Sequence, residues 1–266
     1  VLPMLNIFSK NFTQEIDFSR DDLKTLFSIV YPTTKDYIDL ENLSQTDREK
    51  YVPKDLDAKV YLDYDKNNFI TADIKFVYGD QEFNPLLEND LEISRDAIKE
   101  SEVLEMFRKT GFMLDEKNAR LILTNDEYIY NFLTNDIERY MQKLEVLATD
   151  NFKQKEVKQP RIVSLGVRVE NNLLNIDLTK IDFDPELVNI LNKYKLKKKF
   201  YRLKDGSFLD LQDNENLEFL NNITESLDID YKELEKGNIK LPIYRTLYLD
   251  RLLENLKDAN ISKDDE

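Results

Sequence analysis

The chain has 266 residues, of which 41% are hydrophobic, so it can bury a substantial core as one large domain or as two ordinary ones. It contains no cysteine and no histidine, which excludes disulfides, Ser-His and Cys-His catalytic sites, and zinc sites built from those ligands. Its formal net charge of −15 argues against a surface that lies as a whole on nucleic acid, because phosphate contacts need a cationic face.

No apolar stretch of the sequence approaches the roughly 18 residues needed to cross a bilayer. The first ten residues, VLPMLNIFSK, lack the basic region and the long apolar run of a signal peptide. These features predict a soluble, intracellular protein that makes no membrane contact. The chain also begins at Val1 rather than at methionine, so we expect it to be a domain of a longer polypeptide.

Charge is unevenly distributed along the chain. Residues 150–205 carry 13 Lys and Arg against 8 Asp and Glu, although the chain as a whole is acidic. Within them, residues 151–160, NFKQKEVKQP, are polar and end in a proline, which disfavours helix at the residue before it. We therefore predict a boundary here, between an N-terminal α+β subdomain over 1–150 and a C-terminal α+β subdomain over 151–266.

The stretch 59–79, KVYLDYDKNNFITADIKFVYG, alternates apolar and polar residues on both sides of a polar centre. This pattern predicts two antiparallel strands whose apolar side chains share a face. A three-residue connection near Asn67 and Asn68 sets the expected register. It places Val60, Leu62 and Tyr64 opposite Phe76, Ile74 and Ala72.

The rest of the first half predicts two helices separated by a strand. Ser94 can cap a helix that continues to Gly111, because glycine readily adopts the left-handed conformation in which helices commonly end. Residues 119–124, ARLILT, have the composition of a strand. Thr124 lies three residues before a glutamate, the spacing of a capping box, which predicts a second helix to about Val146, either continuous or broken near Asn135.

The stretch 163–180, VSLGVRVENNLLNIDLTK, alternates in the same way. A two-residue turn at Asn171 and Asn172 predicts a hairpin with one apolar face and one face toward water. The expected pairs are Val169 with Leu174, Val167 with Ile176, Leu165 with Leu178, Arg168 with Asn175 and Gly166 with Asp177.

Helices are predicted after this hairpin from their caps and apolar spacing. Asp184 and Pro185 open a helix whose apolar residues from Leu187 to Tyr194 follow helical spacing. Three further helices are expected to begin at Asp213, Asp230 and Pro242. The predicted fold class is therefore α+β, with antiparallel hairpins at 59–78 and 162–180 and helices packed on them in two subdomains.

The stretch 197–211, KKKFYRLKDGSFLDL, carries five basic side chains around an Asp-Gly pair. Asp205 and Gly206 favour a tight primed turn, which predicts a hairpin. Its expected faces hold Tyr201, Leu203 and Phe208 on one side, and Phe200, Leu209 and Leu211 with the basic residues of the strand on the other. Two interpretations stay open: a solvated hairpin edge, or a nucleic-acid contact. The candidates for that contact are Lys197, Lys198, Lys199, Arg202 and Lys204.

The last predicted helix lies in LPIYRTLYLDRLLENL, residues 241–256. Four leucines form one stripe that we expect to be buried: Leu249, Leu252, Leu253 and Leu256. Tyr244, Tyr248 and Arg251 fall on a neighbouring face, where they either form a protein interface or complete the local core. The residues after Lys257 are mostly polar and are expected to be loosely ordered.

The sequence contains no motif for nucleotide or metal chemistry. Its glycines, at 79, 111, 166, 206 and 237, cannot form a phosphate-binding P-loop or a dinucleotide fingerprint, which need closely spaced glycines. Asp63 and Asp65 have a spacing that metal ligands use, but it is common at solvated strand ends. We therefore assign no catalytic, cofactor-binding or metal residue.

Three segments of the chain resemble the bacterial Swi/Snf helicase-associated domain: KVYLDYDKNNFITADIKFVYGDQEFNPL, ELVNILNKYKLKKKFYRLKDGSFLDL and LPIYRTLYLDRLL. That domain precedes the ATPase motor in many Firmicute Swi/Snf-family proteins. The resemblance runs in order from Lys59 to Leu253, residues 202–206 are its most distinctive piece, and residues 1–58 match only loosely. It implies a cytoplasmic bacterial parent protein with a zinc-binding module upstream and a two-lobed, DNA-stimulated ATPase downstream. ATP and magnesium would bind in that motor, so this chain is expected not to be an enzyme.

Two functions are compatible with these features. The first is a regulatory accessory domain that packs on the motor lobes of the same polypeptide, with Tyr244, Tyr248 and Arg251 as interface candidates. The second is a module that contacts DNA through the basic hairpin around 193–204. The acidic composition and the lack of a chemical motif favour the first function, and a standalone enzyme is the least favoured.

Overall fold

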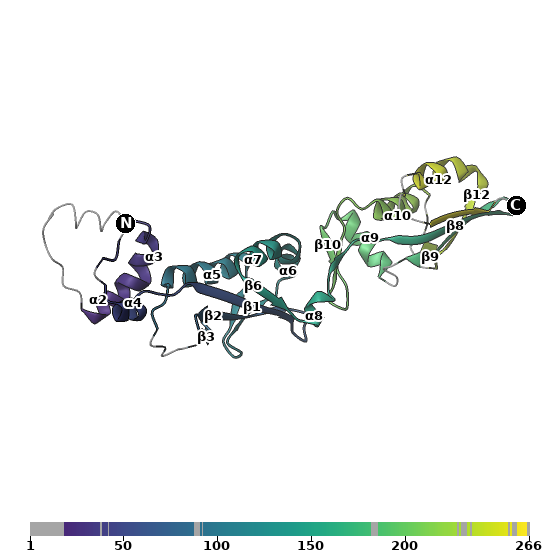
Figure 1. Cartoon of the computed structure of the whole chain (residues 1–266). Coiled ribbons are helices and arrows are strands. Elements are labelled where there is room, and N and C mark those ends of the chain that lie inside the picture. The colour runs from purple at the N-terminus through teal and green to yellow at the C-terminus, as the bar shows by residue number, and fades with distance from the viewer. Residues whose placement is uncertain are drawn as a thin grey trace. The chain divides into compact units, whose positions relative to one another are not determined.

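The computed structural model describes residues 19–37, 39–41, 43–87, 91, 93–181, 186–227, 229, 233–234, 236–254, 256 and 260–264 (Figure 1). The chain divides into two compact units, unit 1 at Val1–Lys153 and unit 2 at Gln154–Glu266. Within the ranges that the structure describes, no helix is both long enough and apolar enough to cross a bilayer.

Residues 19–51 of unit 1, apart from two undescribed positions, contain short helices for which the sequence carried no prediction. Ser19 caps the first of them, and its side chain and that of Asp22 each bond to the backbone of the other, the reciprocal pattern of a capping box. Phe27 is buried and stacks on Tyr51 with 6.1 Å between ring centroids. The elements are α2 (Arg20–Thr25), the π-helix η1 (Leu26–Val30), α3 (Tyr31–Thr34) and α4 (Gln45–Tyr51).

The first predicted hairpin is confirmed as β1 (Leu56–Tyr64) and β2 (Ile70–Tyr78), but its predicted register is wrong by two residues. The loop has three residues as predicted, but it is residues 66–68 and is centred one residue earlier, because the Asp65 N–H donates to the Phe69 carbonyl at 2.9 Å. The Asp65 carboxylate fixes this loop by accepting the backbone N–H groups of Asn67 and Phe69, both at 2.9 Å. Since the shift is an even number, the apolar side chains keep their shared face. The observed pairs are Val60 with Ile74, Leu62 with Ala72 and Tyr64 with Ile70.

Helix α5 (Ala97–Thr110) ends as predicted at Gly111, whose φ is +97°. Its cap is Asp96 rather than Ser94, and Ser94 instead donates a hydrogen bond to the Tyr51 carbonyl. The next helix is capped by Asn125 rather than Thr124. The remaining elements are β3 (Gln81–Phe83), β4 (Met113–Asp115), β5 (Arg120–Leu123), α6 (Asp126–Asn131), the π-helix η2 (Phe132–Asp136), α7 (Ile137–Lys143), β6 (Glu145–Ala148) and α8 (Asp150–Lys153).

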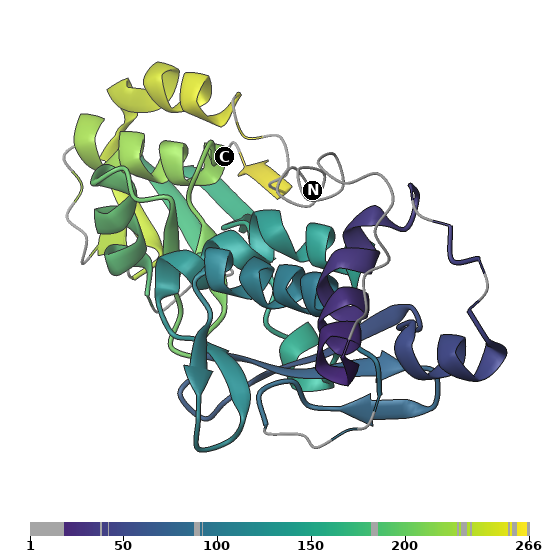
Figure 2. The same ribbon diagram turned by 90° about the vertical axis from the view of Figure 1, so that its left-hand side faces the viewer.

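The sheet of unit 1 has the strand order β4-β5-β2-β1-β6, with β3 paired to β2. The predicted continuation of helix to Val146 is wrong, because residues 145–148 form β6, which pairs in parallel with β1. Figures 1 and 2 show α5 and α7 along one face of this sheet. Beneath them, four rings form a closed cycle of edge-to-face contacts with centroids 4.9–5.3 Å apart: Phe107, Phe112, Phe132 and Tyr140.

Unit 2 is built on the second predicted hairpin, β8 (Ile162–Glu170) and β9 (Leu173–Ile181). Asn171 and Asn172 have φ of +53° and +57°, as a two-residue primed turn requires. The predicted pairs hold from Val169 to Gly166, but a register shift on the far side of Gly166 removes the pairing of Leu165 with Leu178.

Helices and edge strands complete unit 2. Buried leucines and isoleucines from α9, α10 and α12 pack on the β8–β9 sheet in one core. The elements are β7 (Val157–Lys158), α9 (Leu187–Lys195), β10 (Phe200–Arg202), β11 (Phe208–Asp210), α10 (Glu215–Ser226), β12 (Asn238–Pro242), the 3-10 helix η3 (Ile243–Arg245), α12 (Thr246–Leu253) and β13 (Asn260–Asp264).

Two helices of unit 2 begin at other residues than predicted. Helix α10 is capped by Asn214 instead of Asp213. Pro242 ends β12 and precedes η3, so the last α-helix begins four residues later than predicted, at Thr246. The predicted caps at Asp184 and Asp230 lie outside the described residues.

The expectation of loose order after Lys257 is wrong for Asn260–Asp264, which form β13 and pair in parallel with β8. Its sheet has the order β12-β9-β8-β13, while β10, β11 and β7 form a separate three-stranded sheet. The predicted α+β class is confirmed, although each of the three sheets also contains a parallel pair that the sequence did not predict.

Candidate functional site

The basic hairpin forms at β10 and β11, but its turn differs from the prediction. The Gly206 N–H donates to the Leu203 carbonyl at 2.9 Å, and the Leu203 N–H donates to the Ser207 carbonyl at 2.8 Å. Residues 204–206 therefore form a three-residue loop in which only Gly206 has positive φ, at +89°. Burial by itself raises the pKa of the Asp205 carboxyl group. Hydrogen bonds from the Ser207 hydroxyl and N–H outweigh burial and lower the pKa of Asp205 from its ordinary value.

The extra loop residue exchanges the predicted faces of the hairpin. Arg202 pairs with Phe208 and Tyr201 with Leu209, so residues predicted on opposite faces share one. The Phe200 and Phe208 rings pack at 5.3 Å, and the Arg202 guanidinium lies 5.2 Å from the centre of the Phe208 ring. Arg202 is thereby held on an aromatic ring, away from the three lysines that precede the strand.

The Tyr201 side chain also contacts another part of the protein, because its hydroxyl donates to Glu186 Oε2 at 2.8 Å. Burial, and then the hydrogen bond and charge of Glu186, raise the pKa of Tyr201. The backbone N–H of Lys204 donates to the same carboxylate at 3.4 Å, while its side chain is exposed. The two rings that the sequence offered for base stacking, Phe200 and Tyr201, thus pack within the protein.

Lys197, Lys198 and Lys199 lie at the end of α9 and line a pocket of about 580 Å³. Its other walls come from the last turn of α9, from residues 211–213 and from α10. The structure therefore divides the five predicted basic candidates: three lysines share this pocket, whereas Arg202 and Lys204 do not line it.

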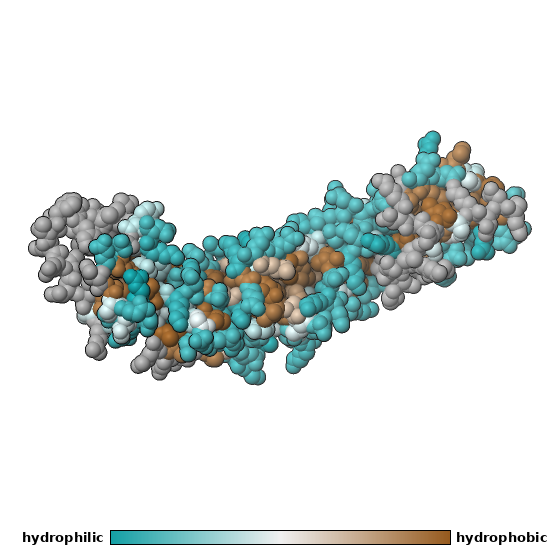
Figure 3. All heavy atoms as spheres, viewed as in Figure 1, coloured by the Kyte–Doolittle hydropathy of each residue, from teal (hydrophilic) through white to brown (hydrophobic). Residues whose placement is uncertain are grey.

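A second candidate surface lies on η3 and α12. Leu247 is 80% exposed and Tyr244 is 74% exposed, although both have large hydrophobic side chains. Leu173 joins them, because it pairs with Pro242, and the Ile243 N–H donates to the Asn172 carbonyl at 3.3 Å. We name as the outer apolar surface the exposed residues Leu173, Ile243, Tyr244, Leu247 and Tyr248. Figure 3 shows hydrophobic atoms at the surface over α12.

The predicted interface candidates belong to this surface or border it. Tyr244, Tyr248 and Arg251 are exposed, and residues three or four apart lie on the same side of a helix. The predicted inner stripe of Leu249, Leu252, Leu253 and Leu256 is buried. Tyr244 therefore does not complete the local core. Sequence reasoning missed Ile243 and Leu247, whose spacing of four residues was the available signal.

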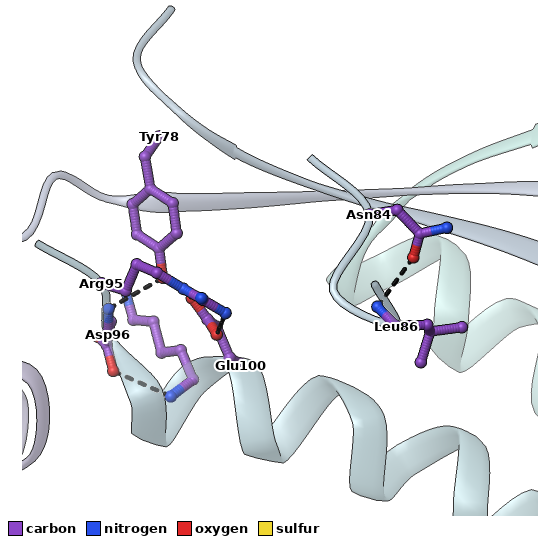
Figure 4. A network of polar contacts seen from close by, with 7 residues as sticks. Tyr78, Asn84, Leu86, Arg95, Asp96 and Glu100 are labelled. Atoms are coloured by element: carbon purple, nitrogen blue, oxygen red, sulfur yellow. Dashed lines mark hydrogen bonds and ion pairs between the residues drawn. The ribbon is translucent and has the colours of Figure 1, made fainter. Parts of the chain in front are cut away.

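Unit 1 contains a buried polar network, which Figure 4 shows between β2 and the start of α5. The Tyr78 hydroxyl donates to Glu100 Oε1 at 2.8 Å and accepts the Asp96 N–H at 2.9 Å. Arg95 donates twice to Glu100, at 2.8 and 2.5 Å, and lies over the Phe83 ring. Burial, followed by the hydrogen bond to Glu100, raises the pKa of Tyr78 far above its ordinary range. The network ties β2 to α5.

The two carboxylates of the metal-like spacing have structural roles. Asp63 accepts hydrogen bonds from Thr149 and Asn151, at 2.7 and 3.0 Å, and Asp65 organises the β1–β2 loop. In the part of the chain that the structure describes, no three Asp or Glu residues are grouped so that they could hold a metal ion.

The chain was compared with models of protein families. A family model described as bacterial SNF2 helicase associated matches residues 1–266. The match extends beyond residues 59–253, over which the motifs showed the resemblance, and includes the N-terminal helices. No curated protein and no solved structure matches the chain.

Proposed function

This chain belongs to the bacterial SNF2 helicase-associated family, and we propose that it is a non-catalytic accessory domain that docks on the motor of an SNF2-type helicase. The motor lies elsewhere in the same cytoplasmic polypeptide and binds ATP and magnesium. The domain couples its docking to the ATP-driven closure of the motor lobes. Its docking site is the outer apolar surface.

The observation that carries this proposal is the 80% exposure of Leu247 on a helix whose opposite side is fully packed. Exposed apolar patches mark interaction sites when they are contiguous and bordered by polar groups. Here two cations lie at the border: Arg251 follows Leu247 by one helical turn, and the Arg245 guanidinium lies 5.5 Å from the centre of the Tyr244 ring. Tyrosine and arginine are enriched in protein interfaces.

The chemistry of this surface supports a particular kind of partner. Apolar side chains on η3 and α12 need an apolar hollow, and Arg245 and Arg251 favour acidic groups at its rim. Arg245 is already oriented, because its Nη1 donates to the Ser226 carbonyl at 3.0 Å. A helicase motor lobe with an acidic rim around an apolar hollow is the partner that fits.

The direct test uses the complete SNF2-type protein that carries this chain. Backbone hydrogen exchange at residues 243–251 is measured in the complete protein and in the isolated chain. Docking predicts slower exchange in the complete protein, because the helix is covered. Substitution of Leu247 and Tyr244 by Gln is expected to remove that protection and to change nucleic-acid-stimulated ATP turnover.

The control substitution is Met141→Gln, at a residue that is 62% exposed on α7 of unit 1. It removes a comparable apolar side chain from another helix and is expected to leave exchange and turnover unchanged. Each substitution of an exposed side chain should alter the free energy of unfolding of the chain by no more than about 0.5 kcal/mol. Equal exchange in the complete protein and the isolated chain would contradict the proposal.

A further inference from the structure

The pocket at the end of α9 holds uncompensated positive charge in an acidic chain. Lys195 pairs with Glu225 at 3.5 Å. In the part of the chain that the structure describes, Lys197, Lys198 and Lys199 form no ion pair. The carboxylate that remains in the lining is that of Asp213. The pocket therefore carries net positive charge, whereas the chain carries −15.

The backbone at this place suggests a use for the lysines other than stability. Lys197 has φ of +54°, and its N–H donates to the Tyr194 carbonyl at 2.8 Å while the Lys198 N–H donates to the Lys193 carbonyl at 3.1 Å. Glycine is usual at such a helix end, and a residue with a Cβ is strained there. Asp213, across the pocket, also has positive φ, at +48°. Strained residues of this kind concentrate at binding sites.

The helix dipole does not account for all these lysines. Lys193 and Lys195 lie in the last turn of α9, where a cation stabilises the negative end of the helix, and the effect fades beyond that turn. Lys197, Lys198 and Lys199 follow the helix. Two of the terminal carbonyls accept N–H groups from Lys197 and Lys198, so they are already satisfied and repel an incoming anion less.

The uncharged walls of the pocket fit a planar, hydrogen-bonding group. Tyr194 is half-buried at one side, where its ring packs against the core, and the amides of Gln212 and Asn221 line the other. Asn221 Oδ1 is buried, and it has no hydrogen-bond partner among the described residues. Because the Asn221 side chain lines the pocket, rotation of its amide would let a donor on a ligand, such as a base amino group or a ribose hydroxyl, supply that partner.

We propose that this pocket binds one nucleotide of single-stranded nucleic acid, with the phosphates on Lys197, Lys198 and Lys199 and the base against Tyr194. A volume of about 580 Å³ suits a small-molecule-sized group. Single-strand sites combine a cationic groove with an aromatic ring for stacking. A duplex keeps its bases stacked inside and cannot place one in a pocket without unpairing it. This site is separate from the outer apolar surface, so it stands without the docking proposal.

The test measures fluorescence anisotropy of labelled oligonucleotides with the whole 266-residue chain over a series of salt concentrations. The probes are oligo(dT), oligo(rU) and a duplex, each of about ten nucleotides, a length within the range of single-strand sites. We expect the single strands to bind more tightly than the duplex, and the ratio of dT to rU affinity identifies DNA or RNA as the source. Polyglutamate serves as an acidic-protein probe.

The pocket variant combines Lys197→Gly, Lys198→Gln and Lys199→Gln. Its control, Lys204→Gln with Lys236→Gln and Lys240→Gln, removes the same charge from exposed lysines of unit 2 outside the pocket. The pocket variant is expected to bind at least about tenfold more weakly and to lower the salt slope by about 2, since each lost phosphate contact removes about 0.7. The control should lose less than about threefold, as a change in net charge alone does.

Two single substitutions separate binding from folding. Lys197→Gly is expected to weaken binding without lowering the unfolding midpoint, because glycine accepts positive φ. Tyr194→Leu keeps an apolar contact with the core but removes the stacking surface, and should weaken binding about tenfold. Equal losses in the pocket and control variants overturn the proposal. It also fails if Tyr194→Leu is silent, or if polyglutamate binds the pocket and the oligonucleotides do not.

Discussion

The two units of this chain share one strand arrangement but are filled with different side chains. In each, a long hairpin is flanked by a strand antiparallel to its second strand and by a strand parallel to its first. The flanking strands are β5 and β6 in unit 1, and β12 and β13 in unit 2. In both, a helical segment connects the two flanking strands, α6 to α7 in one and η3 to α12 in the other.

The cores of the two units differ in chemistry. Unit 1 packs rings edge to face around Phe132 and Tyr140, and it buries the Tyr78–Glu100 network. Unit 2 fills its core mainly with leucine and isoleucine. The same arrangement of strands is thus compatible with two different core chemistries. Both proposed interaction sites lie in unit 2.

The largest effect should come from breaking the ring cycle of unit 1. Phe132→Ala is expected to lower the free energy of unfolding by about 3–5 kcal/mol, because it leaves a cavity and removes edge-to-face contacts. The matched change in unit 2 is Leu220→Ala, at a side chain that is also fully buried. Leu220→Ala should lower the free energy of unfolding by less than Phe132→Ala does, within the range of about 2–5 kcal/mol. Chemical denaturation measures both, and a larger loss for Leu220→Ala would remove the energetic distinction between the cores.

Alkaline pH should affect unit 1 through Tyr140. Burial raises the pKa of Tyr140 to about 12, and its hydroxyl donates to the Met106 carbonyl at 3.0 Å. A folded-state pKa above the unfolded value of about 10 means that the stabilisation is complete below pH ~10 and is lost as pH rises toward 12. Over that window, wild type should lose up to about 3 kcal/mol relative to Tyr140→Phe. Parallel pH dependences of the two proteins, followed by urea unfolding, would contradict this.

Two glycines with positive φ, one in each unit, allow the two units to be compared at single backbone positions. A Cβ at Gly111 in unit 1 would lie 2.7 Å from Cδ2 of Tyr128, and φ there is +97°. Gly206 in unit 2 has φ of +89° in the loop between β10 and β11. Gly111→Ala is therefore expected to cost about 2 kcal/mol and Gly206→Ala about 1 kcal/mol, the latter from positive φ alone. Thermal unfolding of the two variants checks the order, and the reverse order would contradict it.

Features that depend on neighbouring residues could be predicted from the sequence. The two-residue turn at Asn171 and Asn172, the left-handed end at Gly111 and the buried stripe of α12 are all present. Each follows from local backbone preference or from the spacing of apolar residues within one element. Helix caps were displaced by one or two residues, as at Asp96 and Asn214, because several adjacent polar side chains can satisfy the same free N–H groups.

The candidate sites were predicted only in part. Tyr244, Tyr248 and Arg251 could be named because their spacing puts them together on a helix, but the exposure of Leu247 depends on which side of α12 the core occupies. The basic candidates separated because Lys197, Lys198 and Lys199 precede β10 beside the end of α9, whereas Arg202 lies in β10 and Lys204 in the loop. The extra loop residue at Asp205 changed which residues of β11 share a face with those of β10. A shift of one residue in a hairpin moves side chains to the other face.

The sequence by itself determined which segments form hairpins and which helix faces are apolar, because periodicity is a local property. Tertiary structure alone decided the parallel pairing of β6 with β1 and of β13 with β8. Lys59 pairs with Glu145, and Ser164 with Asn260. No local pattern specifies such distant partners, because a short strand is stabilised by the sheet edge that it meets and not by its own residues.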